Sequence, residues 1–149
     1  MKHASFLIPV ILITITCVLV ACSKSNNGSK PKITLKTITT EIPPQGGLDA
    51  TFDFTPGSAS LSGGTFVAIR IRQNQIPLPP TTVSVDSVMS TIPDFPSVNK
   101  GQFEYQEDYN YLHQSDAEND TVIFKFAVLD VAGHSSDTIT TGKIVIHIP

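Results

Sequence analysis

The chain has 149 residues, of which 40% are hydrophobic and 15% are charged, and its formal net charge is −3. This length suits one domain and excludes a large multidomain enzyme. The small net charge, without a basic cluster that has interleaved aromatic residues, argues against a nucleic-acid partner. The two cysteines, Cys17 and Cys22, are too few for a disulfide-rich scaffold or for a zinc site built from cysteine alone.

The first segment has the composition of an export signal. Lys2 is followed by an almost wholly apolar run from Ala4 to Val20, which is typical of a secretory signal peptide. A transmembrane helix that is retained is the alternative, because a run of ~17 residues is at the lower limit for crossing a bilayer. Length alone does not decide between the two.

The end of this run carries a more specific pattern, Leu19-Val20-Ala21-Cys22. It resembles the lipobox of bacterial lipoprotein precursors, of the Bacteroidota type. The resemblance implies that residues 1–21 are a signal peptide, that cleavage falls between Ala21 and Cys22, and that the Cys22 thiol receives a diacylglyceryl group. A chance cysteine after an ordinary signal peptide is the alternative. Lipidation would leave the mature chain without a free thiol.

Residues 22–31 are small and polar after the cysteine, and we interpret them as a flexible tether. Ser23, in place of Asp, follows Cys22. By resemblance to lipoprotein sorting rules, this favours the outer membrane over the inner one. The acidic run that resembles a surface-export signal is absent, which favours the leaflet that faces the periplasm. The expected partners are the membrane, through the lipid, and an unidentified envelope protein or glycan.

From residue 32 to 149 the dominant hydrophobic period is two, which indicates strands. Leu48 to Thr55 alternates between apolar and polar residues, and so do the runs 67–72, 102–106, 122–128 and 143–148. In the run 67–72 the set Val67, Ile69 and Ile71 alternates with Ala68, Arg70 and Arg72. We expect Arg70 and Arg72 to pair with acidic neighbours across the sheet, and binding of an anionic group is the alternative. The run 122–128 is apolar on one face and partly apolar on the other, so it is the most buried strand expected.

Two weaker strands complete a set of about seven. One is Val83 to Val85. In the other, Ile33 and Leu35 share one register but Ile38 and Ile42 share the opposite one. A bulge or a switch between sheets near Lys36 or Thr37 would reconcile them. Short strands at this spacing predict an all-β fold, an antiparallel β-sandwich of immunoglobulin or fibronectin-III type, with a small barrel or a jelly roll as alternatives.

The segment from Asp120 to Ser136 resembles the penultimate strand and following turn of bacterial immunoglobulin-like repeats. Its Asp130-Val131-Ala132-Gly133-His134 has His134 at the position where those repeats usually carry Asn. The chain has no tryptophan, no core disulfide and no tyrosine at the start of this strand, which excludes an antibody-like core and a tyrosine corner. The domain expected over 32–149 is therefore a generic Ig-like sandwich.

The sequence does not predict catalysis. His113 and His134 fall in turns, His147 falls on the polar side of the last strand, and no nucleophile elbow, metalloprotease helix or phosphate-binding glycine loop is present.

Three carboxylates, Asp116, Glu118 and Asp120, occupy alternate positions of an expected loop. Hard oxygen ligands in this arrangement suit Ca²⁺. The alternative is a solvated loop in which these side chains cap turns. Asp130 is expected to accept hydrogen bonds from backbone N–H groups in its turn.

Two further features concern the surface. Ser87, Thr121 and Thr138 each follow Asp and precede an apolar residue, which resembles the O-glycosylation sequon of exported Bacteroidota proteins. Tyr109 and Tyr111 form either an exposed aromatic strip or part of the core, whereas Tyr105 is expected in the core.

Together these features predict a lipid-anchored lipoprotein of the cell envelope with a non-catalytic Ig-like domain for binding or scaffolding. A glycan- or calcium-binding accessory lipoprotein of a nutrient-uptake system is the first alternative. A small envelope enzyme is the second.

Overall fold

The computed structural model describes residues 28–78, 80–96 and 99–149. The predicted signal peptide, its cleavage site at Ala21 and the lipidation site Cys22 lie outside the described residues. The strands are β1 (Lys32–Ile38), β2 (Glu41–Ile42), β3 (Gly47–Thr55), β4 (Thr65–Arg72), β5 (Val85–Thr91), β6 (Gly101–Asp108), β7 (Asp120–Leu129), β8 (Ile139–Thr140) and β9 (Ile144–Ile146). A single helical turn, α2 (Tyr109–Leu112), follows β6.

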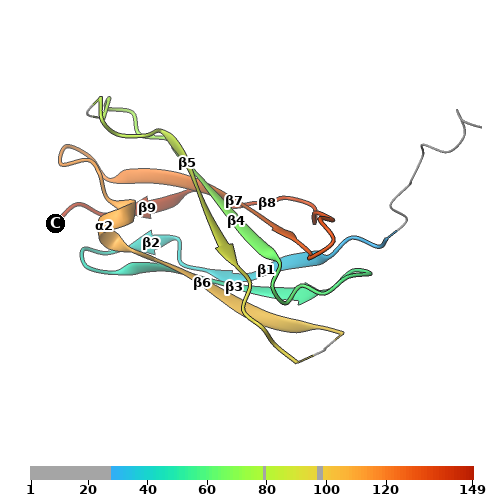
Figure 1. Cartoon of the computed structure of the whole chain (residues 1–149). Helices are drawn as coiled ribbons and strands as arrows, with labels where there is room; N and C mark the ends of the chain where they lie inside the picture. Colours follow the sequence, from blue (N-terminus) through green and yellow to red (C-terminus); the bar gives the residue numbers. More distant parts are fainter. Residues whose placement is uncertain (1–27, 79, 97–98) are drawn as a thin grey trace, which may run out of the picture.

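These strands form two sheets that pack face to face (Figure 1). The smaller sheet has the order β1-β3-β6, and the larger has the order β2-β9-β7-β4-β5, with β8 also paired to β7. The predicted all-β, Ig-like sandwich is confirmed. The described residues also contain two separate strands of two residues each, β2 and β8, beyond the seven strands expected.

The first strand contains the irregularity that its apolar residues predict. The register of β1 against β3 shifts between Leu35 and Thr37. The chain then changes sheets within two residues: the Thr39 N–H donates to Asp49 O of β3 at 3.0 Å, and Thr40 O accepts from the N–H of Val145 of β9 at 2.8 Å. β2 runs parallel to β9. Both features considered from the sequence, a bulge and a switch between sheets, are therefore present.

Aromatic side chains from both sheets fill the space between them. Phe52 of β3 and Phe126 of β7 are fully buried, with ring centroids 4.9 Å apart. Phe66 of β4 packs against Phe126 at 5.7 Å and against Phe103 of β6 at 5.3 Å. β7 has alternating buried positions along its whole length, including Phe124 and Phe126, so it is a central core strand as predicted.

The apolar set of β4 does not form the inward face of that strand. Phe66, Ala68, Arg70 and Arg72 point inward and are buried, whereas the residues between them are only partly buried. The strand is apolar on both sides, so the position of the arginines could not be deduced from alternation. Their burial is possible because carboxylates from neighbouring strands meet them, as described below.

The strand pairing defines two ends of the sandwich. At one end, which we call the tether end, β1 begins beside the last residue of β3, since Lys32 pairs with Thr55. At the other, which we call the far end, lie the end of β4, the start of β7 and the end of β9, because Arg72 pairs with Val122 and Asp120 pairs with Ile146. Figure 1 shows α2 and the C-terminus at this far end, with the start of β1 toward the opposite side.

Candidate functional site

A buried ion pair lies at the far end. Nη1 of Arg72 is 3.2 Å from Oδ1 of Asp120, and the side chains of both residues are almost completely buried. The Asp120 carboxylate also accepts the backbone N–H groups of Gln114 at 2.6 Å and Ser115 at 3.0 Å. Arg72 in turn donates to Leu112 O at 2.9 Å. Asp120 therefore fixes the loop after α2 at the same time as it neutralises a buried cation.

A second arginine lies beside the first. Nε of Arg70 donates to Oδ1 of Asp86, its cross-strand partner on β5, at 2.9 Å. The Arg70 guanidinium also donates to Tyr111 O and lies 3.8 Å above the centre of the Tyr111 ring. The expectation that both arginines pair with acidic neighbours is confirmed. Burial, together with the nearby Arg70 charge, lowers the pKa of Arg72, although Asp120 and Asp86 act in the opposite direction.

The three tyrosines take different positions. Tyr105 is in the core as predicted, and burial together with its hydrogen bond to Glu107 raises its pKa strongly. Tyr109 is also buried, and its hydroxyl donates to His147 O at 2.6 Å. Tyr111 is partly buried against Arg70, and its hydroxyl donates to Asp86 at 3.1 Å. The tyrosines therefore support the packing at this end, and Tyr109 and Tyr111 do not form an exposed strip.

A cavity of about 270 Å³ adjoins the buried ion pair. Its polar lining comes from Arg72, Asn74, Thr82 and Ser84, and its apolar lining comes from Ile76, Pro77, Leu78 and Pro80. The loop between β4 and β5 supplies almost all of these residues. At its base this loop is joined to the body by the Gln73 N–H, which donates to Thr121 O at 2.7 Å.

The three predicted calcium ligands take different partners. Asp116 is fully exposed, Glu118 accepts the Ile76 N–H at 2.6 Å, and Asp120 is engaged by Arg72 and the Gln114 and Ser115 N–H groups. Across residues 28–78, 80–96 and 99–149, no group of three His, Cys, Asp or Glu side chains is placed to hold a metal ion. In this conformation Glu118 and Asp120 position loops, and Asp116 does not join them.

The remaining predicted residues are spread over the molecule. Ser87 on β5 and Thr138 before β8 are exposed, whereas Thr121 on β7 is partly buried. The three histidines of the described residues each lie beside a carboxylate, in a different turn or strand: His113 near Asp120, His134 near Asp130, and His147 near Glu41.

Asp130 has the turn role that its position predicts. Oδ1 accepts the N–H groups of Ala132 at 2.9 Å and His134 at 2.8 Å. Burial acts to raise the pKa of Asp130, but these hydrogen bonds and the one to the His134 ring outweigh it and leave the pKa below its usual value.

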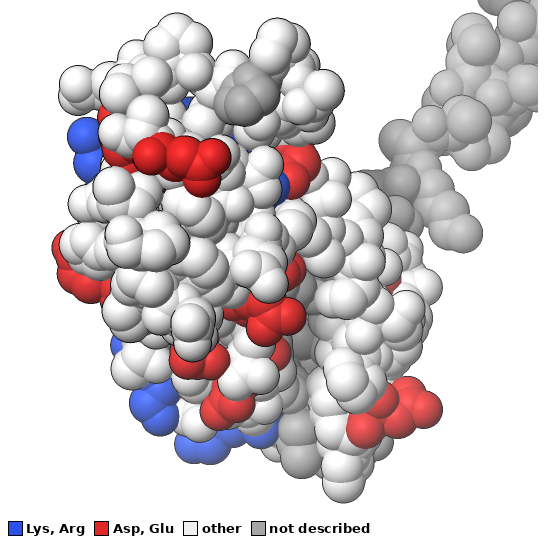
Figure 2. Space-filling view, turned by 90° about the vertical axis from the view of Figure 1, so that its left-hand side faces the viewer, with Lys and Arg blue, Asp and Glu red and all other residues white. Residues whose placement is uncertain are grey.

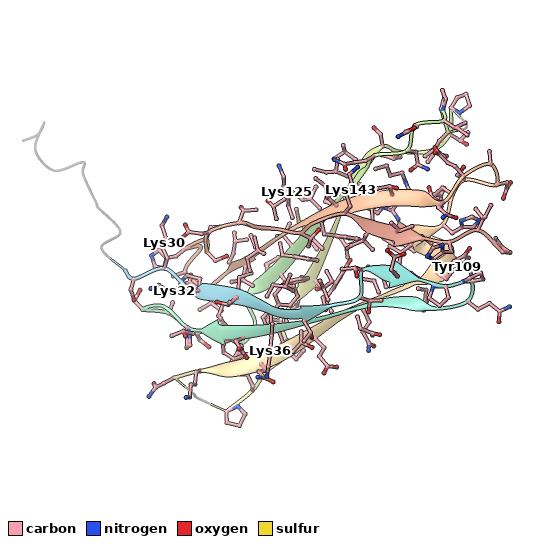
Figure 3. All side chains as sticks on the ribbon, turned by 180° about the vertical axis from the view of Figure 1, so that it is seen from behind. Lys30, Lys32, Lys36, Tyr109, Lys125 and Lys143 are labelled. Atoms are coloured by element: carbon pink, nitrogen blue, oxygen red, sulfur yellow. The ribbon has the colours of Figure 1, made fainter. Side chains whose placement is uncertain are left out.

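At the tether end, residues 28–31 already contact the sandwich. The Ser58 N–H donates to Ser29 O at 2.9 Å. A Cβ atom on Gly57 would lie 2.0 Å from that same carbonyl oxygen. The close approach of the two backbone segments at this point therefore requires glycine. Figure 3 shows Lys30 and Lys32 close to this point, whereas Lys36 lies further along β1.

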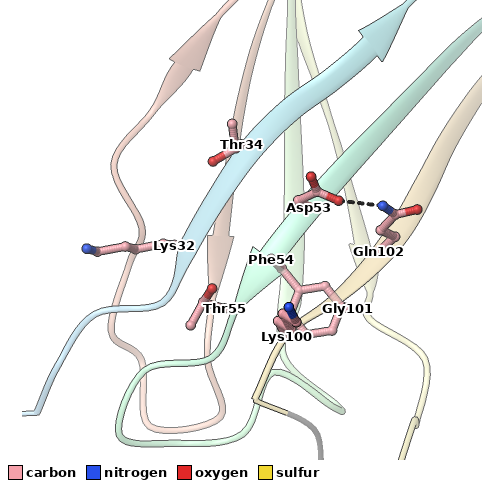
Figure 4. A pocket seen from close by; sticks show the side chains of 8 residues that line it. All are labelled: Lys32, Thr34, Asp53, Phe54, Thr55, Lys100, Gly101 and Gln102. Atoms are coloured by element: carbon pink, nitrogen blue, oxygen red, sulfur yellow. Dashed lines mark hydrogen bonds between the residues drawn. The ribbon is translucent and has the colours of Figure 1, made fainter.

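An open depression of about 560 Å³ lies on the outer face of the small sheet near the tether end. Figure 4 shows Lys32 and Lys100 at its border and Asp53 bonded to Gln102 beside them, with Nε2 of Gln102 donating to Oδ1 of Asp53 at 2.7 Å. These two side chains are therefore hydrogen-bonded to each other. Figure 2, which faces the far end, shows acidic groups spread singly over that surface.

Comparison with known proteins adds little. No family model matches the chain, and no curated protein matches it. A solved β-glucosidase from Listeria innocua in complex with glucose is similar over 81% of this chain, with 9% sequence identity and a TM-score of 0.37. The chain spans about 17% of the length of that enzyme. In the described part of the chain, no helix is long and apolar enough to cross a membrane.

Proposed function

We propose that this protein is a lipid-anchored lipoprotein of the cell envelope, and that its Ig-like sandwich is a non-catalytic domain for binding or scaffolding. The observation that carries the proposal is the sequence Leu19-Val20-Ala21-Cys22 at the end of an apolar run. Ser23 after the cysteine favours the outer membrane, and the lack of a following acidic run favours its periplasmic leaflet. Two or more acyl chains on the lipidated cysteine would give stable anchoring, whereas a single chain gives only marginal membrane binding.

The fold supports the proposal through the position of the tether. The tether joins the sandwich where Ser29 bonds to Ser58, at one end, and the loops that surround the buried ion pair lie at the other. An anchor at Cys22 would therefore hold the tether end toward the lipid and direct the far end away from it. The far end is the part of the domain that would meet a partner.

The charge distribution agrees with this orientation. Residues 22–36 contain four lysines and no acidic residue, whereas residues 37–149 contain five basic and thirteen acidic residues, a net charge of −8 from 5 − 13. A basic segment next to an anionic lipid surface is attracted to it, and an acidic domain is repelled from it. The two effects together favour a domain that stands off the membrane.

Lipidation is tested by labelling cells that express the full precursor with a radioactive or alkyne-tagged fatty acid. We expect the tag on the wild-type protein and on a Cys17→Ala variant, because Cys17 lies in the part that is removed. The Cys22→Ala variant should lose the tag and keep its signal peptide. If this variant still loses residues 1–21 and fractionates with membranes, the lipoprotein proposal is wrong.

A further inference from the structure

The larger sheet has an apolar face that points away from the small sheet. In β4 the residues between the buried ones lie on this face, and the strand register places residues of β5 and β7 beside them. Three cross-strand rows result, each running from β7 through β4 to β5: Ile123-Ile71-Val85, Lys125-Ile69-Ser87 and Ala127-Val67-Met89. We call these nine residues the outer patch. Seven of them are apolar, and Lys125 is their single charged member.

The outward face of the small sheet is different. Its cross-strand pairs between β3 and β6 are Asp49-Gln106, Thr51-Glu104 and Asp53-Gln102, all of them polar. An antiparallel sheet with one side toward water normally has such a polar side. The larger sheet departs from this pattern in β4 and its two neighbours. Strands that are apolar on both sides are typical of sheets that are covered on both sides.

The described strands and the described helical turn do not supply that cover. They form two sheets and the turn α2, which lies at the far end (Figure 1). Figure 3 shows Lys125 on the side of the larger sheet that faces away from the small one. Met89 is 70% exposed and Val85 is 52% exposed. Since contiguous exposed apolar patches mark interaction sites, the outer patch is a candidate contact surface.

The arrangement of the outer patch suits a second copy of the same patch. A two-fold axis along β4 places each row against itself, so that the β7 residue of one copy lies opposite the β5 residue of the other. Ile123 then meets Val85 of the second copy. Lys125 meets the Ser87 hydroxyl of the second copy, which can accept a hydrogen bond from the ammonium group. No like charges of the two patches face each other.

The same axis agrees with the direction of the tether. β4 pairs with β7 from Thr65-Leu129 to Arg72-Val122, and Arg72 lies at the far end, so β4 runs toward that end. A rotation about a line along β4 therefore leaves both tether ends on the same side. Two copies anchored in one leaflet need this arrangement. The choice of axis thus rests on the proposed lipid anchor, whereas the matching of the residues does not.

The size of the outer patch predicts a weak pair. With strands about 4.8 Å apart and rows about 7 Å apart, the patch has a flat footprint of roughly 300 Å². A standard interface covers about 800 Å² of each partner. The patch is therefore too small for a tight dimer in dilute solution. Anchoring both copies in one leaflet raises their effective concentration, as a linker does, so a weak contact is sufficient there.

We propose that the outer patch is the contact between two copies of this chain, which pack sheet against sheet about a two-fold axis along β4. Two sheets that pack in an aligned manner lie about 10 Å apart, with their side chains interdigitated. The proposal adds a self-association surface to the anchored domain. Lipidation is measured by the fatty-acid tag and pairing by cross-linking, so each proposal can fail without the other.

The test is cross-linking of the full chain in the membranes of the cells that produce it. Ile69 lies on the proposed axis, so Ile69→Cys places two thiols opposite each other, and a bismaleimide of roughly 10 Å matches the spacing of the sheets. We expect a covalent dimer. Thr51→Cys, on the outward face of the small sheet, is the matched control and should give only the background amount. The chain without an added cysteine measures the background from Cys17 and Cys22.

A charge placed on the outer patch should separate the copies. Met89→Lys would bury an unpaired ammonium group against Ala127 of the second copy, so the dimer of the Ile69→Cys chain should fall at least about tenfold. Because Met89 is 70% exposed, this variant should unfold at the wild-type temperature. Ile148→Lys is its control, since Ile148 is also exposed but lies outside the outer patch, and the dimer should be unchanged.

Three results would overturn the proposal. They are no dimer above background for Ile69→Cys, equal amounts of dimer for Ile69→Cys and Thr51→Cys, and a dimer that persists in the Met89→Lys variant. Protection of the Ile69→Cys thiol from a water-soluble maleimide, without a cross-linked dimer, would show that lipid or another protein covers the patch. That outcome would also exclude a second copy as its occupant.

Discussion

Replacing Asp120 with alanine should be among the most damaging single changes outside the aromatic core. Its carboxylate has three partners, the Arg72 guanidinium and the N–H groups of Gln114 and Ser115, and its side chain has no exposed surface. Removing one member of a buried ion pair costs about 3–5 kcal/mol, because the remaining charge has no counter-ion. Two N–H groups also lose their acceptor, so we expect a loss near the top of that range, about 5 kcal/mol.

Replacing Arg72, the other member of the pair, should lower the free energy of unfolding by less. In Arg72→Met, the Asp120 carboxylate keeps both N–H donors and His113 nearby, with Nδ1 at 3.2 Å. We therefore expect a smaller loss, about 3 kcal/mol. In the double variant Arg72→Met/Asp120→Ala, neither charge of this pair is left buried without its partner, and the main remaining cost is the lost acceptor of the Gln114 and Ser115 N–H groups. The double variant should be more stable than Asp120→Ala alone.

The assay is urea unfolding at neutral pH, followed by circular dichroism, with the free energy of unfolding obtained by linear extrapolation. Asp116→Ala is the control, because that carboxylate is fully exposed, and its unfolding midpoint should not change. Two results would refute the reasoning: a loss below about 1 kcal/mol for Asp120→Ala, or a double variant whose loss equals the sum of the two single losses.

Three further predictions concern other parts of the sandwich. Phe52→Ala should lower the free energy of unfolding by about 3–5 kcal/mol in the same urea assay, because the ring is fully buried against Phe126, and a loss below ~1 kcal/mol would contradict its core position. Gly101→Ala should cost about 1–3 kcal/mol, since its Cβ would lie 2.6 Å from the Phe54 ring; an unchanged midpoint would show that the ring moves freely. The hydrogen bonds that lower the pKa of Asp130 should stabilise the fold fully above about pH 4, where an unfolded aspartate ionises, and progressively less as the pH falls through the lower folded value. Thermal unfolding at pH 7 and pH 3 should therefore show a smaller pH dependence for Asp130→Asn than for wild type, and an equal dependence would contradict this role.

The fold could be predicted where each strand has one apolar face. The alternation of β3 places Leu48, Ala50, Phe52 and Phe54 in the core, and the structure agrees. The change of register between Leu35 and Ile38 also indicated where the first strand leaves its sheet. Such signals are local, because one strand carries them by itself.

The site could not be predicted in the same way. Alternation in β4 separates Val67, Ile69 and Ile71 from the arginines, but the arginines face inward because Asp86 and Asp120 reach them from other strands. That information is non-local. Asn74 lies between two other polar residues of a loop, Gln73 and Gln75, and nothing in this polar run distinguishes the one whose carboxamide atoms are buried. The only available signal was two arginines at a spacing of two in an otherwise apolar strand.

The early change of sheet by the first strand has a mechanical consequence. If the far end is held by a partner while Cys22 is held in lipid, the pull passes through Ser29 into β1 along the direction of that strand. The hydrogen bonds of β1 to β3 run perpendicular to the strands, so they are loaded in shear and must break together instead of opening one by one. Behind them, the parallel pairing of β2 with β9 transfers any remaining load to the second sheet. The N-terminal strand would thus act as a force-bearing clamp between the anchor and the core.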